Sequence, residues 1–403
     1  MMSAVLLAAL LAQNFEQRGY FENSTLLFPQ SAADDSGHAV NETVFHWDVS
    51  YKASSWLKLN GSFEARVDSH RQDARDWSLD FDGRSMQRPA FSLRQFSATI
   101  HKGKVTAELG RQFIRWGRTD ILTPTDRFAP RDYLGNVVDS DFLGVIAARA
   151  TIQATSADSL DLVWQPWFTP SRTPLLNQRW TVIPPEADGV AIVDAGARYP
   201  GGSQFGARWN HTGSAFEYSL CFFDGENNLP LLNAASNPSA PILTVQRYYP
   251  SLRLYGGDAA APLKWVTVKG EAAYFTTSTP GSDEYVLYVL QLERVVREWT
   301  FVGGYAGQHV TRSASNSLSF NPDLGFAGSF VGRAAYTIDV TRSLAVETAV
   351  RAAGSFARFE YSQAFGQHWR GTAGVAWIRG ATTDFIGEYH RNSYVSLALR
   401  YSF

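Results

Sequence analysis

The feature that most constrains this chain is an alternation of apolar and polar residues that continues through segments of ten residues or more. In the stretch TVFHWDVSY, Phe45, Trp47 and Val49 fall on one face, whereas His46 and Asp48 fall on the other. Strands of soluble sheets commonly have about five or six residues, whereas a tilted strand that crosses a bilayer needs about 9–11. The alternation therefore predicts membrane-spanning β-strands with one face toward lipid and the other toward water.

Eighteen segments follow this rule, and the connections between them alternate between short and long almost throughout. The candidate strands are 17–28, 41–52, 55–68, 89–101, 103–113, 142–153, 159–168, 203–211, 214–223, 245–256, 264–276, 284–296, 299–310, 328–340, 343–353, 355–365, 368–379 and 392–403. Short periplasmic turns and long outer loops are typical of transmembrane barrels. We therefore predict an all-β fold, an antiparallel up-and-down transmembrane β-barrel of about 18 strands. Sixteen strands is the alternative, if two weak segments are loop.

The last twelve residues, NSYVSLALRYSF, alternate toward a terminal aromatic residue, and Leu399, Tyr401 and Phe403 share the apolar face. This segment resembles the C-terminal strand of bacterial outer-membrane proteins, whose terminal aromatic residue is read by the barrel-assembly machinery. The resemblance implies a place in the outer membrane of a Gram-negative cell. It also implies membrane lipid, lipopolysaccharide and that machinery as partners. The alternative is an ordinary amphipathic strand that happens to end at phenylalanine.

Residues 1–12, MMSAVLLAALLA, form a short apolar run with small residues. The run resembles the apolar region of a secretory signal, with cleavage near Ala12 or Gln13. It lacks the Lys or Arg that usually precedes such a region, which leaves open a truncated start or a buried N-terminal segment. We predict a signal peptide over residues 1–12 and a single barrel domain over residues 13–403.

The composition and the motifs exclude several classes of function. The net charge is −2, whereas a nucleic-acid partner calls for a basic excess. Cys221 is the only cysteine, so no internal disulfide and no cysteine-based zinc cluster can form. The sequence contains no HExxH, no G-x-S-x-G and no phosphate-binding G-x-x-x-x-G-K-[ST]. We therefore expect no metal, no cofactor and no enzymatic activity.

Residues 114–141 join the fifth and sixth predicted strands and form the third outer loop. Charged residues of both signs gather there beside aromatic residues. In general porins the third outer loop commonly folds into the barrel and narrows it, so this resemblance implies a constriction. Opposed charges across a narrow aqueous bore would orient polar solutes. The candidate solute contacts are Arg111, Arg115, Arg118, Asp120, Asp126, Arg127, Arg131 and Asp132. The alternative is that these charges pair with one another and fix an external loop that touches no solute.

Charged residues also lie on the polar face of the predicted wall. Those expected to face the loop across the lumen are Arg66, Arg94, Glu108, Arg149 and Arg208. Arginine suits this position because its charge is permanent and its planar guanidinium matches carboxylate or phosphate. Alternatively, these residues form salt bridges between neighbouring strands, and both roles can hold together.

The run Arg111-Gln112, followed by Trp116-Gly117, is similar to the end of a strand in barrels related to alginate-export porins. In that group an R-Q-x-x-x-W-G run precedes a loop directed into the lumen. An acidic residue often follows the glycine there, whereas Arg118 stands here, which puts a shared substrate in doubt. Tryptophan is favoured at membrane interfaces and glycine permits a sharp turn. We therefore predict that Trp116-Gly117 marks the point where wall becomes loop.

Two functions are compatible with these features. A porin-like channel for the passive diffusion of small polar or anionic solutes accounts for the wall, the loop rhythm and the charged third loop. The alternative is a non-transport outer-membrane barrel, either a structural or adhesion protein or an outer-membrane enzyme. A soluble all-β protein is disfavoured by the length of the strands. We predict the channel.

Overall fold

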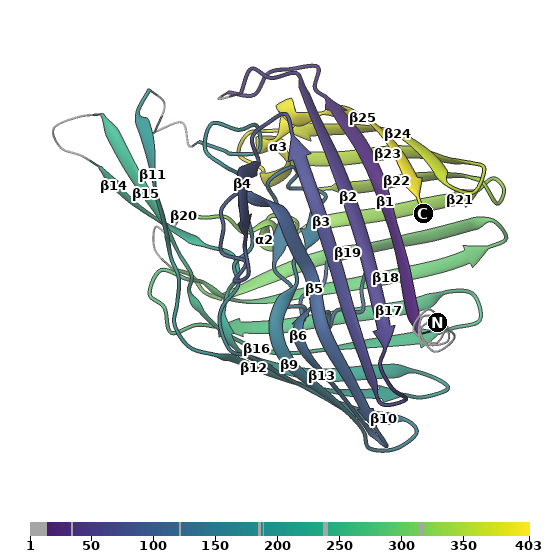
Figure 1. Ribbon diagram of the computed structural model, residues 1–403. Coiled ribbons are helices and arrows are strands. Elements are labelled where there is room, and N and C mark those ends of the chain that lie inside the picture. The colour runs from purple at the N-terminus through teal and green to yellow at the C-terminus, as the bar shows by residue number, and fades with distance from the viewer. Residues whose placement is uncertain are drawn as a thin grey trace.

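A computed structural model of the protein describes residues 14–403, except residues 34, 121, 184–186, 188, 237–240 and 315–317. The predicted signal segment, residues 1–12, lies outside the described residues. Eighteen antiparallel strands form a barrel (Figure 1). They are β1 (Phe15–Leu27), β2 (Ala39–Lys52), β3 (Leu57–Asp68), β5 (Arg88–Lys102), β6 (Val105–Gln112), β9 (Val145–Gln153), β10 (Asp158–Gln165), β12 (Gln204–Thr212), β13 (Glu217–Glu226), β16 (Ser251–Pro262), β17 (Thr267–Thr276), β18 (Glu284–Val296), β19 (Trp299–Arg312), β21 (Ser329–Thr337), β22 (Arg342–Val350), β23 (Gly354–Phe365), β24 (Trp369–Gly380) and β25 (Tyr394–Ser402). The barrel closes because β1 pairs with both β2 and β25.

Short turns connect the strands at one end of the barrel and longer loops connect them at the other, as in the turn between β5 and β6 and the loop between β6 and β9. Strand β1 begins, and β25 ends, at the end with the short turns. The predicted 18-stranded up-and-down barrel is therefore confirmed. The predicted strand at 245–256 is wrong, because its first half belongs to a loop strand and the barrel strand β16 begins only at Ser251.

The long outer loops contain secondary structure of their own, which the sequence did not predict. These elements are β4 (Asp73–Leu79), β7 (Arg131–Asp132), β8 (Asp141–Phe142), β11 (Ala191–Arg198), β14 (Leu231–Ser236), β15 (Ile242–Tyr248), β20 (Leu318–Ser319), α2 (Pro322–Gly325), α3 (Phe385–Glu388) and η2 (His390–Asn392). Strands β11, β15, β14 and β20 pair in that order to form a second sheet. This outer sheet projects from the outer end of the barrel (Figure 1). The outer sheet explains why the predicted strand at 245–256 was misplaced. Strand β15 alternates as the barrel strands do, but it pairs with β14 and β11.

The largest buried apolar cluster lies inside the barrel, between one wall and the third outer loop (residues 113–144, hereafter loop 3). Loop 3 contributes Ile114, Trp116, Leu122 and Phe128, and they pack against inward-facing residues of the strands from β9 to β19. Strand β18 illustrates why this wall needs a cover. In its first half the inward residues, Tyr285, Leu287 and Val289, are as apolar as the outward ones. A strand that is apolar on both faces is normally covered on both, and loop 3 covers the inner face.

The outside of the barrel is apolar and aromatic. Large side chains that alternate with lumen-facing residues are exposed there, among them Phe96, Trp209, Leu220, Phe330 and Leu399. An apolar outer band around a closed barrel is the design of proteins that cross a membrane with strands. The helices of the described chain are all too short or too polar to cross a membrane.

Candidate functional site

Loop 3 crosses the barrel interior, and one buried carboxylate on β17 accepts several of the hydrogen bonds that fix its deep segment to the wall. Glu271, on β17, is buried and accepts five hydrogen bonds from loop 3. The donors are the backbone N–H groups of Arg118, Thr119 and Thr125 and the hydroxyls of Thr119 and Thr125, at 2.8–3.1 Å. Hydrogen bonds to an ionised acceptor are roughly twice as strong as neutral ones. Glu271 therefore anchors residues 118–125 within the lumen.

Charged side chains of this segment pair with the wall. The guanidinium of Arg118 donates to Asp258 on β16 and to Glu217 on β13. Asp120 forms a salt bridge with Lys269 on β17, at 3.0 Å. Arg118 and Asp120 thus tie loop 3 to the barrel, and their contact with solute stays a prediction.

Trp116 lies inside the barrel rather than at its edge. Its side chain is buried, and its indole N–H donates to Asp161 on β10 at 3.0 Å. The next residue, Gly117, approaches Thr123 so closely that an added Cβ would lie 2.3 Å from the Thr123 Cβ, which only glycine permits. The prediction that Trp116-Gly117 marks the point where wall becomes loop is wrong, because β6 ends at Gln112 and the buried carboxylate of Asp161 holds the Trp116 indole inside the barrel.

Salt bridges hold the outer part of loop 3 to other loops. Asp132 is buried and pairs with Arg88 at 2.8 Å and with Arg172 of the fourth outer loop at 3.4 Å. Although burial alone would raise the pKa of Asp132, the two guanidiniums hold it well below its usual range. Arg127 pairs with Asp323, in α2 of the seventh outer loop, at 2.9 Å. Loop 3 is therefore fixed at both its deep and its outer end.

Arg111, at the end of β6, contacts the second outer loop. Its guanidinium donates to the backbone carbonyl oxygens of Asp80 and Phe81, at 3.1 and 3.3 Å. This arrangement lets Arg111 support the loop that precedes β5, and any contact between Arg111 and solute remains a prediction.

Arg115 and Arg131 form a positively charged cluster around one aromatic ring of loop 3. Their guanidinium carbons lie 4.0 and 4.2 Å from the centroid of Phe142. Asp126 lies 3.6 Å from Arg115, but neither of its oxygens accepts a hydrogen bond from a described residue. Burial raises the pKa of Asp126 to about 6. The cluster therefore combines two permanent cations with one carboxyl group, so its local charge stays positive even when Asp126 is ionised.

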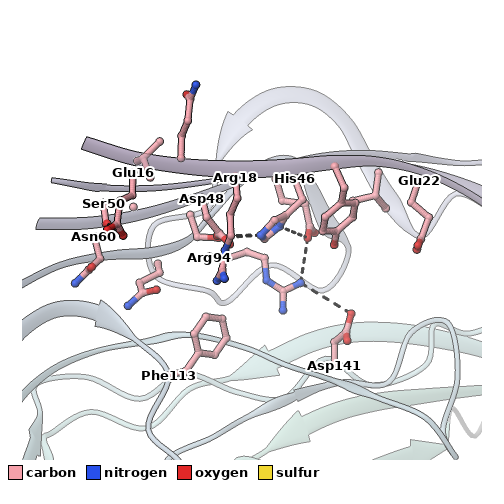
Figure 2. Close-up of a pocket in the computed structure, with 18 of the residues that line it drawn as sticks. Glu16, Arg18, Glu22, His46, Asp48, Ser50, Asn60, Arg94, Phe113 and Asp141 are labelled. Atoms are coloured by element: carbon pink, nitrogen blue, oxygen red, sulfur yellow. Dashed lines mark hydrogen bonds and ion pairs between the residues drawn. The ribbon is translucent and has the colours of Figure 1, made fainter. Parts of the chain in front are cut away.

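A passage remains between loop 3 and the opposite wall, which is built from β1, β2, β3, β5 and β25. It has a volume of about 710 Å³. Figure 2 shows Phe113 and Asp141 of loop 3 on one side, with His46 on the opposite wall. Arg94 lies between the two sides, 3.1 Å from Glu64 of the wall and 3.9 Å from Asp141. The inserted loop thus forms one side of this passage, and the strands β1, β2, β3, β5 and β25 form the other.

Charged side chains of both signs line this passage. The acidic ones are Glu16, Glu22, Glu42, Asp48, Glu64 and Asp141, and the basic ones are Arg18, Lys58, Arg66, Arg94 and Arg400. His46 lies between two of the carboxylates, 2.9 Å from Asp48 and 3.6 Å from Glu64. The sequence reasoning missed the contribution of β1 and β2. The signal was present, because most positions on the polar faces of these two strands are ionisable, as in Glu16, Arg18 and Glu22 of β1 and His46 and Asp48 of β2.

The five predicted wall residues divide into two groups. Arg66 and Arg94 line the passage, and Arg66 also pairs with Glu42 and Glu64 at 2.8 Å. The other three bind residues on other strands, Arg208 reaching past β13 to β16. Glu108 accepts a hydrogen bond from Ser97, Arg149 pairs with Asp161, and Arg208 pairs with Asp258. The structure therefore contains both arrangements considered from the sequence, and any contact of these residues with solute stays a prediction.

The C-terminal residues help to close the barrel. The backbone N–H and carbonyl of Phe403 bond to those of Gly19, at 3.0 Å each. The Phe403 ring stacks near Phe45, with centroids 6.2 Å apart, over the space left by Gly19. Phe403 and Leu399 are exposed on the outer face, whereas Tyr401 is half-buried. The role of Phe403, Tyr401 and Leu399 as an assembly signal stays a prediction.

Several solved porin structures have the same fold as this chain. OccAB4 from Acinetobacter baumannii is 10% identical, with a TM-score of 0.56 over 97% of this chain and 98% of that one. A BenF-like porin from Pseudomonas fluorescens Pf-5 is 10% identical, with a TM-score of 0.55 over 97% and 98%. OccK3 (OpdO) from Pseudomonas aeruginosa is 9% identical, with a TM-score of 0.54 over 98% and 99%. No protein-family model and no curated protein matches the sequence. At these identities the likeness establishes the fold, an 18-stranded porin barrel, and it gives no support to a relation with alginate-export porins.

Proposed function

We propose that this protein is an outer-membrane channel through which small polar or anionic solutes diffuse passively, with loop 3 as its constriction. The observation that carries the proposal is the position of loop 3, which lies inside the barrel and leaves a charged passage of about 710 Å³ along one wall. A closed barrel with an apolar exterior suits the outer membrane, and a polar interior offers solutes a path across it. Diffusion needs a passage of suitable size and charge and no reacting group.

The charges of the passage bear on its selectivity. Acidic and basic side chains are nearly balanced along the wall, so the wall alone favours dipolar solutes over either ion. The local cluster of Arg115 and Arg131 around Phe142 holds two cations beside one carboxyl group, that of Asp126, and supports a moderate preference for anions. Guanidinium groups suit carboxylate or phosphate because they offer paired donors in one plane. A narrower proposal is that this channel and alginate-export porins share a substrate. Swelling of liposomes in oligomers of sugar acids would test it.

Reconstitution into planar bilayers tests the channel and its selectivity. We expect discrete single-channel conductance and a reversal potential that shows a moderate preference for anions. Replacing Arg115 and Arg131 by Gln should shift the reversal potential toward cations. The matched control replaces Lys102 and Lys104, which are exposed near the short turn after β5, and should leave the reversal potential unchanged.

Liposome swelling distinguishes the channel from a non-transport barrel. Liposomes that contain the protein should swell in sugars and small organic acids at rates that fall with solute size. A folded barrel that gives neither swelling nor conductance would refute the channel and favour a structural or adhesion role. The proposal also includes lipid and lipopolysaccharide as the surroundings of the barrel and the barrel-assembly machinery as its partner in assembly.

A further inference from the structure

A second cavity, separate from the passage, lies at the outer mouth of the barrel beside the outer sheet. It has a volume of about 310 Å³, at the small end of the range for small-molecule sites. The fourth, seventh and ninth outer loops form its walls together with β14 and β15. We call this cavity the outer-mouth pocket; its principal lining residues are Trp180, Arg247, Phe320, Phe385, Glu388 and Tyr389. None of its lining residues lines the passage.

Aromatic side chains form much of this pocket. Trp180 of the fourth outer loop and Tyr389 of the ninth are buried, with ring centroids 5.5 Å apart. Phe385 meets Tyr389 edge-on at 5.5 Å, and Phe320 adds a fourth ring from the seventh outer loop. Aromatic faces attract cations, and sites that enclose organic ammonium groups are built in this way.

The charged residues of the pocket are unequally matched. Arg247 is buried and donates to both oxygens of Asp194 at 2.8 Å and to the Thr173 hydroxyl at 3.2 Å. Its charge is therefore compensated. Glu388, on α3, forms no salt bridge with any residue that the structure describes, and the neighbouring charge is that of another carboxylate, Asp384. Burial, with a contribution from Asp384, raises the pKa of Glu388.

We propose that the outer-mouth pocket binds small organic ammonium ions, with Glu388 contacting the charged nitrogen and the aromatic side chains enclosing the apolar body. Such a ligand matches the uncompensated carboxylate and the rings at once. An anion would meet Glu388 with the same sign of charge, and a neutral ring would take water from this half-buried carboxylate without supplying a partner. Because the ligand favours ionised Glu388, binding should strengthen as the pH rises through the pKa of that residue.

Calorimetric titration of the full-length, detergent-solubilised barrel with phenethylamine tests this proposal. Phenethyl alcohol and phenylacetate serve as neutral and anionic analogues of similar shape. We expect saturable binding of phenethylamine at pH 8 and much weaker binding of both analogues. Glu388→Gln should weaken the binding of phenethylamine by about tenfold or more and change the binding of phenethyl alcohol little. Phe320→Leu, which removes one ring and no charge, should also weaken the binding of phenethylamine.

The matched control is Glu298→Gln, which makes the same chemical change at an exposed turn on the opposite end of the barrel. It should bind phenethylamine as the unmodified protein does. Equal binding by the Glu388 and Glu298 variants, or equal affinity for the amine and the alcohol, would overturn the proposal. The titration does not depend on conduction. A conducting barrel that fails to bind phenethylamine refutes this inference alone, and a silent barrel that binds it refutes the channel alone.

Discussion

At the residue scale, the insertion of loop 3 depends on the carboxylate of Glu271, which accepts hydrogen bonds from three residues of the loop. Glu271→Gln keeps the size of the side chain but replaces one acceptor oxygen by a donor NH₂ group that would face these N–H donors. Bonds to a charged acceptor contribute about 1.5–3 kcal/mol each, so we expect the docking of loop 3 to weaken by about 3 kcal/mol. Single-channel recording should show a higher and noisier conductance. An unchanged trace would show that the apolar contacts alone hold the loop.

Asp126 makes the docking of loop 3 depend on pH. Burial raises its pKa to about 6, from an ordinary value of 3.8. A raised pKa in a folded acid contributes stability that is present below pH 3.8 and is lost as the pH rises through 6. The loss amounts to about 3 kcal/mol. We therefore expect Asp126→Asn to melt at the same temperature as the unmodified protein near pH 4, and at a higher temperature near pH 8.

Thermal unfolding followed by circular dichroism across this range checks the prediction for Asp126. Asp120→Asn provides the contrast. Burial alone would raise the pKa of Asp120, but hydrogen bonds from Gln291 and Lys269 lower it overall. Replacing the ionised carboxylate of Asp120 by an amide should therefore destabilise the protein above pH 4. Parallel melting curves for the Asp126 variant and the unmodified protein at all pH values would contradict the argument.

The roles of individual loop residues could not have been predicted from the sequence. Composition indicated that Arg118, Asp120, Arg127 and Asp132 were candidates for solute contact. Their partners lie on other strands and loops, more than forty residues away in most cases. Trp116 is similar, because its position is decided by the buried Asp161 and by the apolar wall behind it. Local patterns identify which residues carry charge, whereas tertiary pairing decides which of them meet water.

At the element scale, loop 3 covers carboxylates as well as apolar residues on the far wall. We expect replacement of residues 118–125 by a short Gly-Ser linker to raise the single-channel conductance several-fold. It should also shift the selectivity toward cations, because Glu217, Asp258 and Glu271 would then face open water. Bilayer recording and reversal potentials measure both effects. An equivalent shortening of the loop between β17 and β18 is the control and should change neither quantity.

Strand positions were largely predictable because the wall alternates wherever lipid lies on one side and water on the other. The exceptions have physical causes. Residues 242–248 alternate for the outer sheet rather than for the barrel wall, and β18 is apolar on both faces because loop 3 covers its inner one. The apolar run in β18 was a signal in the sequence that something packs inside the barrel. It did not identify which loop provides the cover.

At the scale of the whole molecule, closure of the barrel brings β25 against β1 and seats the Phe403 ring over Gly19. We expect Phe403→Ala to lower the yield of assembled barrel in the outer membrane several-fold, while the barrels that do form conduct normally. The control is Phe365→Ala, since Phe365 is a similarly exposed aromatic residue at the end of β23. Equal yields of the two variants would argue against a special role for the terminal residue. Fractionated membranes and bilayer recording provide the two measurements.

The attachment of loop 3 to one set of strands has a consequence for how such a protein can diverge. Strands β10 to β18 must remain complementary to loop 3. A substitution there weakens the attachment of the loop, so we expect few such substitutions among related proteins. Strands β1 and β2 face the passage, and among the described residues they make no hydrogen bond to loop 3. We therefore expect substitutions in these two strands to be tolerated more readily, so that related proteins differ in the solute they prefer while the attachment of loop 3 stays the same.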